Sequence, residues 1–542
     1  LDVPMDAIPS FGGLEVSTTS TALHELTDAF LYLARYPYQG TEQIASRMLA
    51  VAALRDVLGA LNAEGLPSPD SIRASVDEDV RALAARQNGD GGFAAWERGE
   101  RTWPYATIHA AHALQRAIEA GYEVPRPLWD GAMRYVRSVP RILPGDYPVE
   151  VKRALHAYAL YVRQRAGDDV TGEVRGLVAE AGGANALPLE MAGWLLPAAA
   201  SAPPLAAIRD SLLQLVNNRA TETASTATFA TRYTEGEYLL LHSNRRTDAV
   251  VLEGLLAADP RNELVGKAVR GLLGHRVRGR WGNTQENAWV LLAVQRYFRA
   301  YEAESPDFVA RVWLGERYAG SGTFRGRSAE RVQIEVPMST LQQARPGSVT
   351  IGEEGTGRLY YRAALRYAPR DLDLAPLDRG FTVERTYEAV DSAGDVTRGA
   401  DGVWRVRGGA RVRVNVTMTA PSRRLHVALI DPLPAGWEPV NEGLRGSEPA
   451  AEPRTRNGVP PRTRLPGWYG RWWEHQNLRD ERAEAFATLL PAGVHTFSYV
   501  ARATTPGLFI VPPPRAEEMY SPETFGRGRT ERVIVAPAEA RP

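Results

Sequence analysis

The sequence predicts a multidomain protein of mixed α and β class, in which a long helical region is flanked by β regions. Apolar residues recur at three- and four-residue steps over much of residues 19–305, which is typical of helices. From about residue 306 onward, apolar and polar residues alternate, which is typical of half-exposed strands. The length of 542 residues exceeds what one core usually holds and favours about three or four domains.

The composition excludes several classes of protein. Hydrophobic residues make up 44% of the chain and charged residues 24%, as in ordinary globular proteins. The formal net charge is zero, so no global field favours nucleic acid, and no apolar run is long enough for a membrane span. The chain has no cysteine, so disulfides cannot stabilise it. We therefore expect no nucleic-acid partner and no membrane span in this part of the protein.

The first elements in chain order are a strand and two helices. Residues 14–18 read as a short strand after a Gly-Gly turn signal. Leu26, Phe30 and Leu33 mark one face of a helix, and residues 44–58 continue with a second helical pattern. The segment between these two helices, residues 36–43, therefore reads as a tight turn.

Two glycine-rich turns divide the helical region further. Residues 86–93 read RQNGDGGF and are similar to the turn between helices of α/α toroids, in which glycine supplies backbone angles that other residues resist. Residues 279–289 read GRWGNTQENAW and resemble the late turn and helix start of bacterial macroglobulin thioester domains. Helical hairpins that recur over residues 19–305 predict a toroid, with inner and outer helices around one core.

Residues 36–43 carry the most specific motif, because they read YPYQGTEQ. They resemble the motif that opens the thioester domain of the alpha-2-macroglobulin and complement family, which in bacterial members usually reads Tyr-Pro-Tyr-Gly-Cys-x-Glu-Gln. In that family the cysteine sulfur and the last glutamine condense into a thioester. Here Gly40 stands at the cysteine position, while Glu42 and Gln43 match the rest of the motif. Without a thiolate this chemistry cannot proceed, so we expect a degenerate thioester motif and no catalytic residue.

The β regions extend the resemblance in family order. Residues 358–367 read RLYYRAALRY and resemble the segment that closes the CUB-like domain, into which the thioester domain is inserted in that family. Residues 431–439 and 518–527 resemble parts of the terminal macroglobulin domain. The resemblance thus implies three domains, listed here by residue number: a CUB-like β domain (1–18 plus 306–370), a thioester-type α/α toroid lacking the thioester (19–305) and a macroglobulin β-sandwich (371–542).

The resemblance also implies an interdomain contact. In bacterial relatives, aromatic residues of the first motif and a Met-Tyr pair of the last domain shield the thioester from water. Those positions are matched here by Tyr36, Tyr38, Met519 and Tyr520. With no reactive group to protect, we expect these four residues to form an apolar latch between the toroid and the terminal domain.

Two other groups of polar residues have simpler explanations. His109 and His112 could share a helix face and hold a metal, but a structural pair of hydrogen-bonded histidines is favoured because no further ligand falls at a suitable spacing. The acidic run of residues 77–79 could imitate the motif of toroidal cyclases, but a solvated helix face is favoured, near a helix N-terminus. We expect no metal site and no cofactor.

The function that the resemblance implies is that of the C-terminal part of a bacterial alpha-2-macroglobulin-like endopeptidase inhibitor. Its partners would be target proteases, captured after they cleave an upstream bait region. Without a thioester it would trap them sterically, in the periplasm or cell envelope. The alternative is a non-inhibitory cell-envelope interaction scaffold that keeps the same architecture and binds envelope proteins. An enzyme that uses the toroid is the least favoured reading, because it would need a deep cavity with paired carboxylates.

Overall fold

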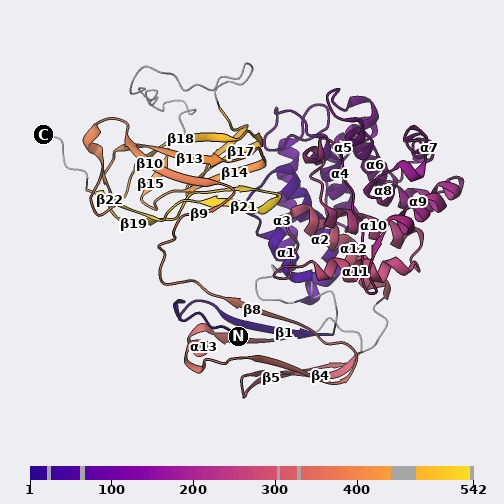
Figure 1. The fold of residues 1–542 in the computed structure, drawn as a ribbon, viewed down its shortest axis with the longest axis horizontal. Helices are drawn as coiled ribbons and strands as arrows, with labels where there is room; N and C mark the ends of the chain where they lie inside the picture. The colour runs from indigo at the N-terminus through magenta and orange to yellow at the C-terminus, as the bar shows by residue number, and fades with distance from the viewer. Residues whose placement is uncertain (21–25, 62–67, 302–305, 326–330, 441–470, 538–542) are drawn as a thin grey trace. The chain divides into compact units, whose positions relative to one another are not determined.

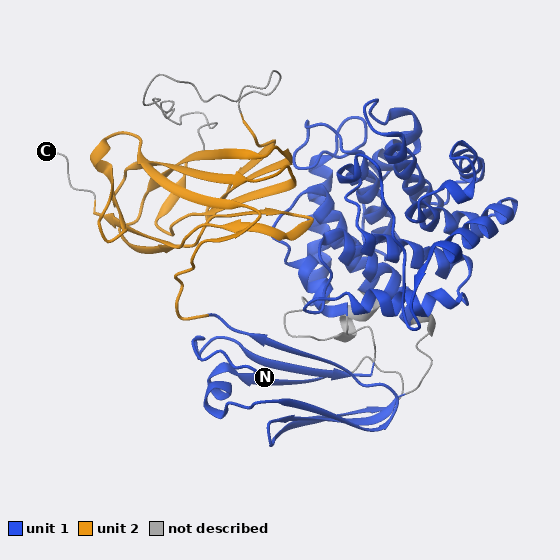
Figure 2. Ribbon diagram, viewed as in Figure 1, with its two compact units in different colours: residues 1–368 blue, residues 369–542 orange. Residues whose placement is uncertain are grey.

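A computed structural model describes residues 1–20, 26–61, 68–301, 306–325, 331–440 and 471–537. Residues 1–368 form one compact unit and residues 369–542 form a second (Figures 1 and 2). The first unit contains the helical region and a small β domain, and the second is built of strands. Among the described residues, every helix is too short or too polar to cross a membrane.

The helical region is a closed ring. Each even-numbered helix from α2 to α12 packs on the next, and α12 packs back on α2 (Figure 1). An α/α toroid has this arrangement, so the predicted toroid is confirmed. The six inner helices are α2 (Thr41–Leu61), α4 (Pro104–Glu119), α6 (Val149–Arg165), α8 (Leu189–Ser201), α10 (Asn244–Ala258) and α12 (Thr284–Tyr301).

The odd-numbered helices form an outer layer, each packed against one or two inner helices. They are α1 (Thr27–Ala34), α3 (Pro69–Arg86), α5 (Arg126–Ile142), α7 (Thr171–Glu180), α9 (Ala206–Arg219) and α11 (Glu263–Gly274). Shorter elements complete the toroid: η2 (Ala184–Ala186), η3 (Pro203–Leu205), η4 (Glu237–Leu240) and the strand pair β2 (Thr221–Glu222) and β3 (Ala227–Thr228).

Inner and outer helices differ in how much of their surface is buried. Helix α4 is buried around almost its whole circumference, with alanine at many positions, whereas α5 buries a single face and exposes its charged residues. Inner helices need small residues because both of their sides contact other helices. Gly193 of α8 and Gly254 of α10 face each other so closely that a β-carbon on Gly254 would lie 2.8 Å from the Gly193 carbonyl oxygen.

The turn after α3 shows why its sequence needs glycine. Gly91 has φ of +88°, and a β-carbon there would lie 2.2 Å from the carbonyl oxygen of Gly131. The Gln87 amide donates to the carbonyl oxygens of Gly91 and Leu128, each at 3.0 Å. The turn therefore fixes outer helix α5 against the hairpin that leads from α3 to α4.

The small β domain is completed by the N-terminal strand. Strand β1 (Gly13–Thr19) lies between β6 (Arg331–Pro337) and β8 (Tyr360–Arg366) and pairs antiparallel with both, Val16 opposite Ile334 and Ala363. This confirms the expected pairing of residues 14–18 with strands from 306–370. The entire toroid lies between these strands in sequence, so it is an insertion into the β domain.

A second sheet covers the first. Strand β4 (Asp307–Leu314) pairs with β5 (Arg317–Arg325) and β7 (Val349–Thr356), and helix α13 (Met338–Ala344) follows β6. Side chains of both sheets share a core, in which Leu14 and Val16 of β1 pack with Val312 of β4. The domain is thus a small two-layer β structure, as predicted for the CUB-like domain.

The second unit is a β-sandwich. Its three sheets have the strand orders β10-β13-β18-β15, β11-β12-β22-β19 and β16-β17-β14-β20-β21-β9. Alternate residues of β13 are buried, as the sequence pattern predicted, and they join one core with residues of all three sheets. The strands are β9 (Leu377–Arg379), β10 (Thr382–Ala389), β11 (Val396–Arg398), β12 (Trp404–Arg407), β13 (Arg411–Ala420), β14 (Arg424–Pro432), β15 (Trp437–Pro439), β16 (His475–Leu478), β17 (Arg482–Leu490), β18 (Gly493–Ala503), β19 (Gly507–Val511), β20 (Arg515–Glu518), β21 (Ser521–Arg527) and β22 (Glu531–Ala536), with η5 (Ala393–Asp395) between β10 and β11.

Candidate functional site

The degenerate motif forms the entry to the first inner helix. Gly40 accepts the first helical hydrogen bond of α2 through its carbonyl oxygen, from the Ile44 N–H at 3.1 Å. The Thr41 N–H donates to the carbonyl oxygen of Ala95 at 2.8 Å, which anchors the turn on a neighbouring loop. A β-carbon on Gly40 would lie 2.5 Å from Gln43 Oε1. The glutamine side chain therefore folds back onto position 40.

The next-to-last residue of the motif, Glu42, points into the helical ring. Its carboxylate is 1% exposed and accepts hydrogen bonds from Thr284 Oγ1 at 2.9 Å, Gln285 Nε2 at 2.6 Å and Ser46 Oγ at 2.6 Å. A carboxylate only accepts, so it suits a site surrounded by donors. Glu42 thus joins the start of α2 to the start of α12 and closes the ring.

Glu42 belongs to a network of buried polar side chains to which all six inner helices contribute. We call the following residues the polar ring: Glu42 (α2), Tyr105 and His109 (α4), Tyr158 (α6), Glu190 (α8), Arg246 (α10) and Gln285 (α12). Each member is at most 1% exposed. Buried polar groups are costly unless they are paired, and hydrogen bonds between neighbouring members pair them here.

Arg246 supplies the positive charge of the polar ring. Its Nε donates to Glu190 Oε1 at 2.7 Å, and its Nη1 donates to Tyr105 Oη at 2.7 Å. Its guanidinium also lies over the ring of Trp194, 5.7 Å from the centroid. Burial alone would raise the pKa of Glu190, but the charge and hydrogen bonds of Arg246 together with those of His242 outweigh burial, so this pKa falls to about 2.

The histidine pair is hydrogen-bonded and neutral. Burial lowers the pKa of His109 to about 3 and the pKa of His112 well below its usual value. Tyr158 Oη lies 2.9 Å from His109 Nδ1 and 3.1 Å from His112 Nδ1. Both histidines therefore have a hydrogen-bond partner, as the structural interpretation of this pair requires. Among the described residues, no group of three or more His, Asp or Glu side chains is placed to hold a metal.

Donors approach both ends of the histidine pair. Arg116 Nε lies 3.4 Å from His112 Nε2, and Gln285 Nε2 lies 3.1 Å from His109 Nε2. Between the two rings, the single Tyr158 hydroxyl contacts both Nδ1 atoms and can donate to only one of them.

The same chain of hydrogen bonds ends at the motif. Ser46 Oγ lies 2.9 Å from His109 Nε2, and the Ser46 hydroxyl donates to Glu42 at 2.6 Å. These contacts tie the first turns of α2 to α4.

Serine, histidine and carboxylate also make up catalytic triads, but this arrangement is a different one. In a triad the histidine lies between the serine and the acid, whereas here Ser46 lies between His109 and Glu42 and donates to the acid. Ser46 and His109 are both fully buried. Trp194 and Trp289 pack around Tyr158 and fill the centre of the toroid. The geometry supports a structural role for Ser46, His109 and Glu42.

The acidic run of residues 77–79 was predicted to lie on a solvated helix face, and only two of its three residues do. Asp77 and Glu78 are exposed, but Asp79 is 2% exposed and forms an ion pair with Arg47, whose Nε lies 2.9 Å from Asp79 Oδ2. The prediction was wrong for Asp79 because the run lies within α3 rather than ahead of it, and one residue in each turn faces α2.

Of the four predicted latch residues, Tyr36 and Tyr38 belong to the first unit, and Met519 and Tyr520 belong to the second. Tyr36 packs edge to face against Tyr38, with ring centroids 5.4 Å apart, in the turn before α2. In the second unit the Met519 N–H donates to the His426 carbonyl oxygen at 2.9 Å. The Tyr520 ring packs edge to face on the His426 ring, 5.2 Å away. Each pair therefore has a defined local setting within its own unit.

Fold and motif together define a class. A toroid interrupts a small β domain and precedes a β-sandwich, which is the domain order that the resemblance to macroglobulin C-terminal regions implied. Residues 380–523 match the family model described as the bacterial alpha-2-macroglobulin MG10 domain. The chain is homologous to the C-terminal region of bacterial alpha-2-macroglobulins.

Individual relatives cover the whole chain at low identity. Circularly permutated Ras protein 2 of Dictyostelium discoideum is 25% identical over 99% of this chain and 15% of its own length. An alpha-2-macroglobulin homolog of Nostoc sp. is 24% identical over 99% of this chain and 27% of its own length. The crystal structure of native Escherichia coli alpha-2-macroglobulin, from domain MG7 to the C-terminus, has a TM-score of 0.77 at 21% identity and covers 99% of this chain and 80% of that chain. The chain therefore spans less than a third of the two curated relatives.

Sequence reasoning missed most of the polar ring. Tyr105, Tyr158, Glu190 and Arg246 carry no short motif, and they lie on four different helices. A signal was present nonetheless. A charged residue such as Arg246 or Glu190 inside an almost wholly buried helix implies a partner, since unpaired buried charges are rarely tolerated.

Proposed function

We propose that this chain is part of a non-enzymatic endopeptidase inhibitor that holds its target protease sterically, without a covalent bond. The supporting observation is Gly40, which stands where a thioester would need sulfur, with Gln43 folded against it. The homology to bacterial alpha-2-macroglobulins supports a protease as partner. The cleavable bait segment would lie elsewhere in the full-length protein.

An activity assay with two substrate sizes tests the proposal. The full-length protein is incubated with a panel of endopeptidases, and cleavage of a large protein substrate is compared with cleavage of a small chromogenic peptide. A steric trap suppresses the first and leaves the second nearly unchanged, because only the small substrate reaches the enclosed active site. Equal inhibition of both substrates would indicate an active-site inhibitor instead, and inhibition of neither would favour the interaction scaffold.

The proposed location is the periplasm or cell envelope, where the scaffold alternative would also act. Homology to bacterial alpha-2-macroglobulins is the basis of this assignment. Fractionation of cells that express the tagged full-length protein tests it. Recovery in the cytoplasmic fraction would exclude both the inhibitor of external proteases and the envelope scaffold.

We further propose the latch that the motifs suggest, with Tyr36 and Tyr38 as one half and Met519 and Tyr520 as the other. Three tyrosines and a thioether offer adaptable apolar surfaces. The double variant Tyr38→Ala with Met519→Ala should increase the radius of gyration measured by small-angle scattering without unfolding either unit. An unchanged radius of gyration would show that these residues are not a latch.

A further inference from the structure

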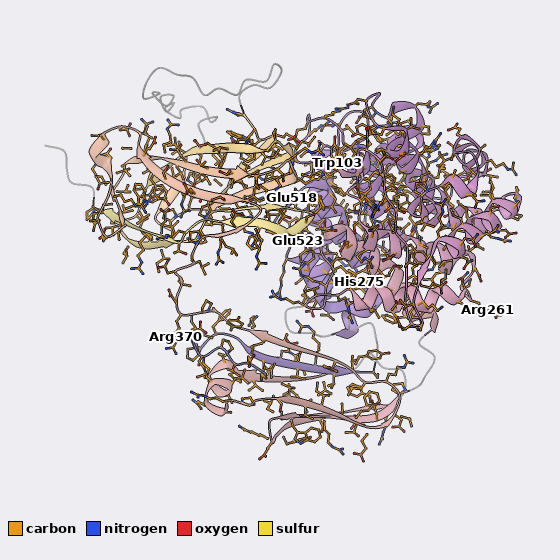
Figure 3. All side chains as sticks on the ribbon, in the orientation of Figure 1. Trp103, Arg261, His275, Arg370, Glu518 and Glu523 are labelled. Carbon is orange, nitrogen blue, oxygen red and sulfur yellow. The ribbon has the colours of Figure 1, made fainter. Side chains whose placement is uncertain are left out.

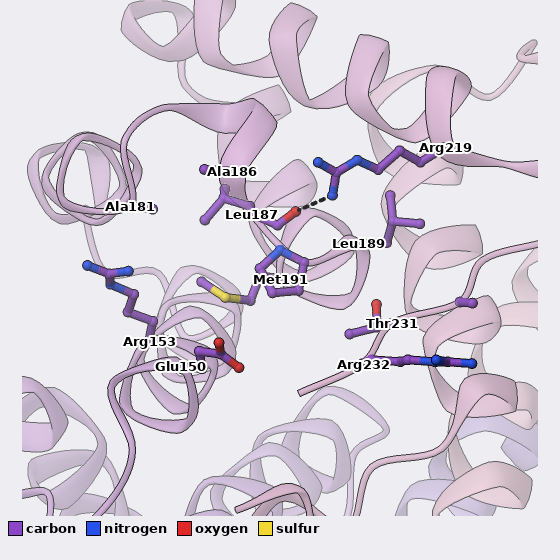
Figure 4. Close-up of a pocket in the computed structure, with 12 residues that line it drawn as sticks. Glu150, Arg153, Ala181, Ala186, Leu187, Leu189, Met191, Arg219, Thr231 and Arg232 are labelled. Atoms are coloured by element: carbon purple, nitrogen blue, oxygen red, sulfur yellow. Dashed lines mark hydrogen bonds between the residues drawn. The ribbon is translucent and has the colours of Figure 1, made fainter. Parts of the chain in front are cut away.

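A cavity of about 330 Å³ opens on the toroid at the ends of four helices (Figure 4). It lies between the first turns of α6 and α8 and the last residues of α7 and α9, and residues 230–232 border it. Its accessible apolar surface is small and comes from Ala186, Pro188 and Ala230, above the buried side chains of Leu187, Leu189 and Met191. The volume is at the lower end of the range for small-ligand sites.

The border of the cavity is strongly basic. Arg153 lies on one side, and Arg219 and Arg232 lie on the opposite side (Figure 4). The N-terminal ends of α6 and α8 add partial positive charge at the same place. The carboxylate of Glu150 is the acidic group of the lining, and it already accepts hydrogen bonds from the Thr234 N–H at 2.9 Å and hydroxyl at 3.0 Å. Positive charge is therefore in excess.

The three arginines differ in what they already bind. Arg153 Nη2 donates to the Glu180 carbonyl oxygen, and Arg219 Nη2 donates to the Asn185 carbonyl oxygen, each at 2.7 Å. A guanidinium has five N–H donors, so both retain donors for a ligand. Arg232 is exposed, and within the described residues it forms neither a hydrogen bond nor an ion pair. Its guanidinium is free to bind an anion.

We propose that this cavity binds a ligand with a carboxylate head and a short apolar body, about the size of one amino-acid residue. The short apolar body packs on Ala186, Pro188 and Ala230, and Arg232 binds the carboxylate. A planar guanidinium matches a carboxylate with two parallel hydrogen bonds, and the apolar contacts favour an organic acid over a small inorganic anion. The ligand is either a free organic acid or the C-terminal residue of a peptide. This site is independent of the proposed inhibitory function.

Calorimetric titration of the purified chain tests the site with matched probes. The probes are N-acetylleucine, N-acetylleucinamide, inorganic phosphate and a tripeptide that ends in leucine with a free carboxylate. The variant Arg232→Ala removes the free guanidinium, and Ala186→Phe fills the cavity without changing its charge. Arg261→Ala is the matched control, because Arg261 is an exposed arginine outside the cavity (Figure 3).

We expect the acid to bind and the amide to bind at least about tenfold more weakly, since a hydrogen-bonded charge pair contributes more than a neutral contact. Arg232→Ala should weaken the acid by a similar factor, Ala186→Phe should abolish binding, and Arg261→Ala should have no effect. Tighter binding of the tripeptide than of the free acid identifies a peptide terminus as the ligand, and the reverse identifies a free acid. Equal binding of acid and amide, equal competition by phosphate, or an unaffected Arg232→Ala variant would overturn the proposal.

Discussion

Gln43 Oε1 lies 2.5 Å from the position that a β-carbon on Gly40 would occupy. Gly40 is not in the left-handed backbone region, so a side chain there meets no dihedral strain. The nearest obstacle is the end of a flexible carboxamide, while the Ala95 carbonyl oxygen and the Trp96 ring are both 3.2 Å away. Residue 40 is thus limited by space and could carry a small side chain after a slight shift of Gln43.

This geometry predicts the behaviour of a Gly40→Cys variant. Because the carboxamide already contacts position 40, the new sulfur lies within reach of Gln43 Cδ, and we expect part of the protein to lose one ammonia as a thioester forms. Intact mass spectrometry measures this loss and, after methylamine treatment, the gain of one methylamine, because aminolysis of the thioester gives a free thiol and an N-methylamide. Gly40→Ser is the control and should keep its full mass. A full-mass, methylamine-insensitive cysteine variant would show that the turn no longer supports the condensation.

Glu42 should be a major contributor to the stability of the toroid. The Glu42→Gln variant places an amide N–H₂ against the donors Thr284 and Gln285, so at least one buried donor loses its acceptor. We expect the free energy of unfolding in urea to fall by about 2–4 kcal/mol. The exposed Glu235→Gln variant should change it by less than about 0.5 kcal/mol. Similar small effects for both would show that Glu42 is not part of a tightly paired network.

Arg246 and Glu190 should be energetically coupled. Both are fully buried and their charged atoms lie 2.7 Å apart, so removing one leaves the other unpaired. Arg246→Met and Glu190→Gln should each cost about 3–5 kcal/mol, whereas the double variant should cost much less than their sum. Urea unfolding of all four proteins measures the coupling. Additive losses would contradict the pairing.

The buried histidines predict a loss of stability in mild acid. Unfolded His109 takes up a proton near pH 6.5, whereas the folded residue does so only near pH 3. The unfolded state therefore binds more protons in this window, and the free energy of unfolding falls as the pH drops through it, by about 1.4 kcal/mol per pH unit for each such histidine. His112 adds to this slope in the same direction.

Variants separate this contribution from other titrating groups. His109→Gln should reduce the slope of the unfolding free energy against pH, between pH 6 and pH 4, by about 1.4 kcal/mol per pH unit, which corresponds to the uptake of one proton. His275→Gln, which changes an exposed histidine at the end of α11, should leave it unchanged. Urea midpoints measured at four pH values give the slopes. Equal slopes for the parent and His109→Gln would mean that His109 is not neutral in the folded protein.

The fold could be predicted in unusual detail because local signals agreed with long-range order. Periodicity marked the helices, alternation marked strands such as β13, and the family motifs occurred in the expected order. Motifs also indicated the pairing of β1 with β6 and β8, which no local pattern could show, since more than 300 residues separate these strands. The helix faces were less well predicted, as Asp79 shows.

The interior of the toroid was largely unpredictable. Hydrogen bonds such as Tyr105 to Arg246 join residues more than 140 positions apart, and their partners depend on how the ring closes. A polar residue at a buried helix position implies a hydrogen-bond partner, but the sequence does not show which residue that partner is. The basic cavity was also missed, because Arg153, Arg219 and Arg232 come from separate segments and show no common spacing.

The central claim is that the protein holds its target without a covalent bond. The direct measurement is mass spectrometry under denaturing conditions. The full-length protein is first incubated with an active endopeptidase that it inhibits in the activity assay. We predict two unmodified species, the cleaved inhibitor and the intact protease, because no acyl group is available for transfer when residue 40 is glycine. A conjugate whose mass is the sum of inhibitor and protease less one ammonia or water would contradict the account.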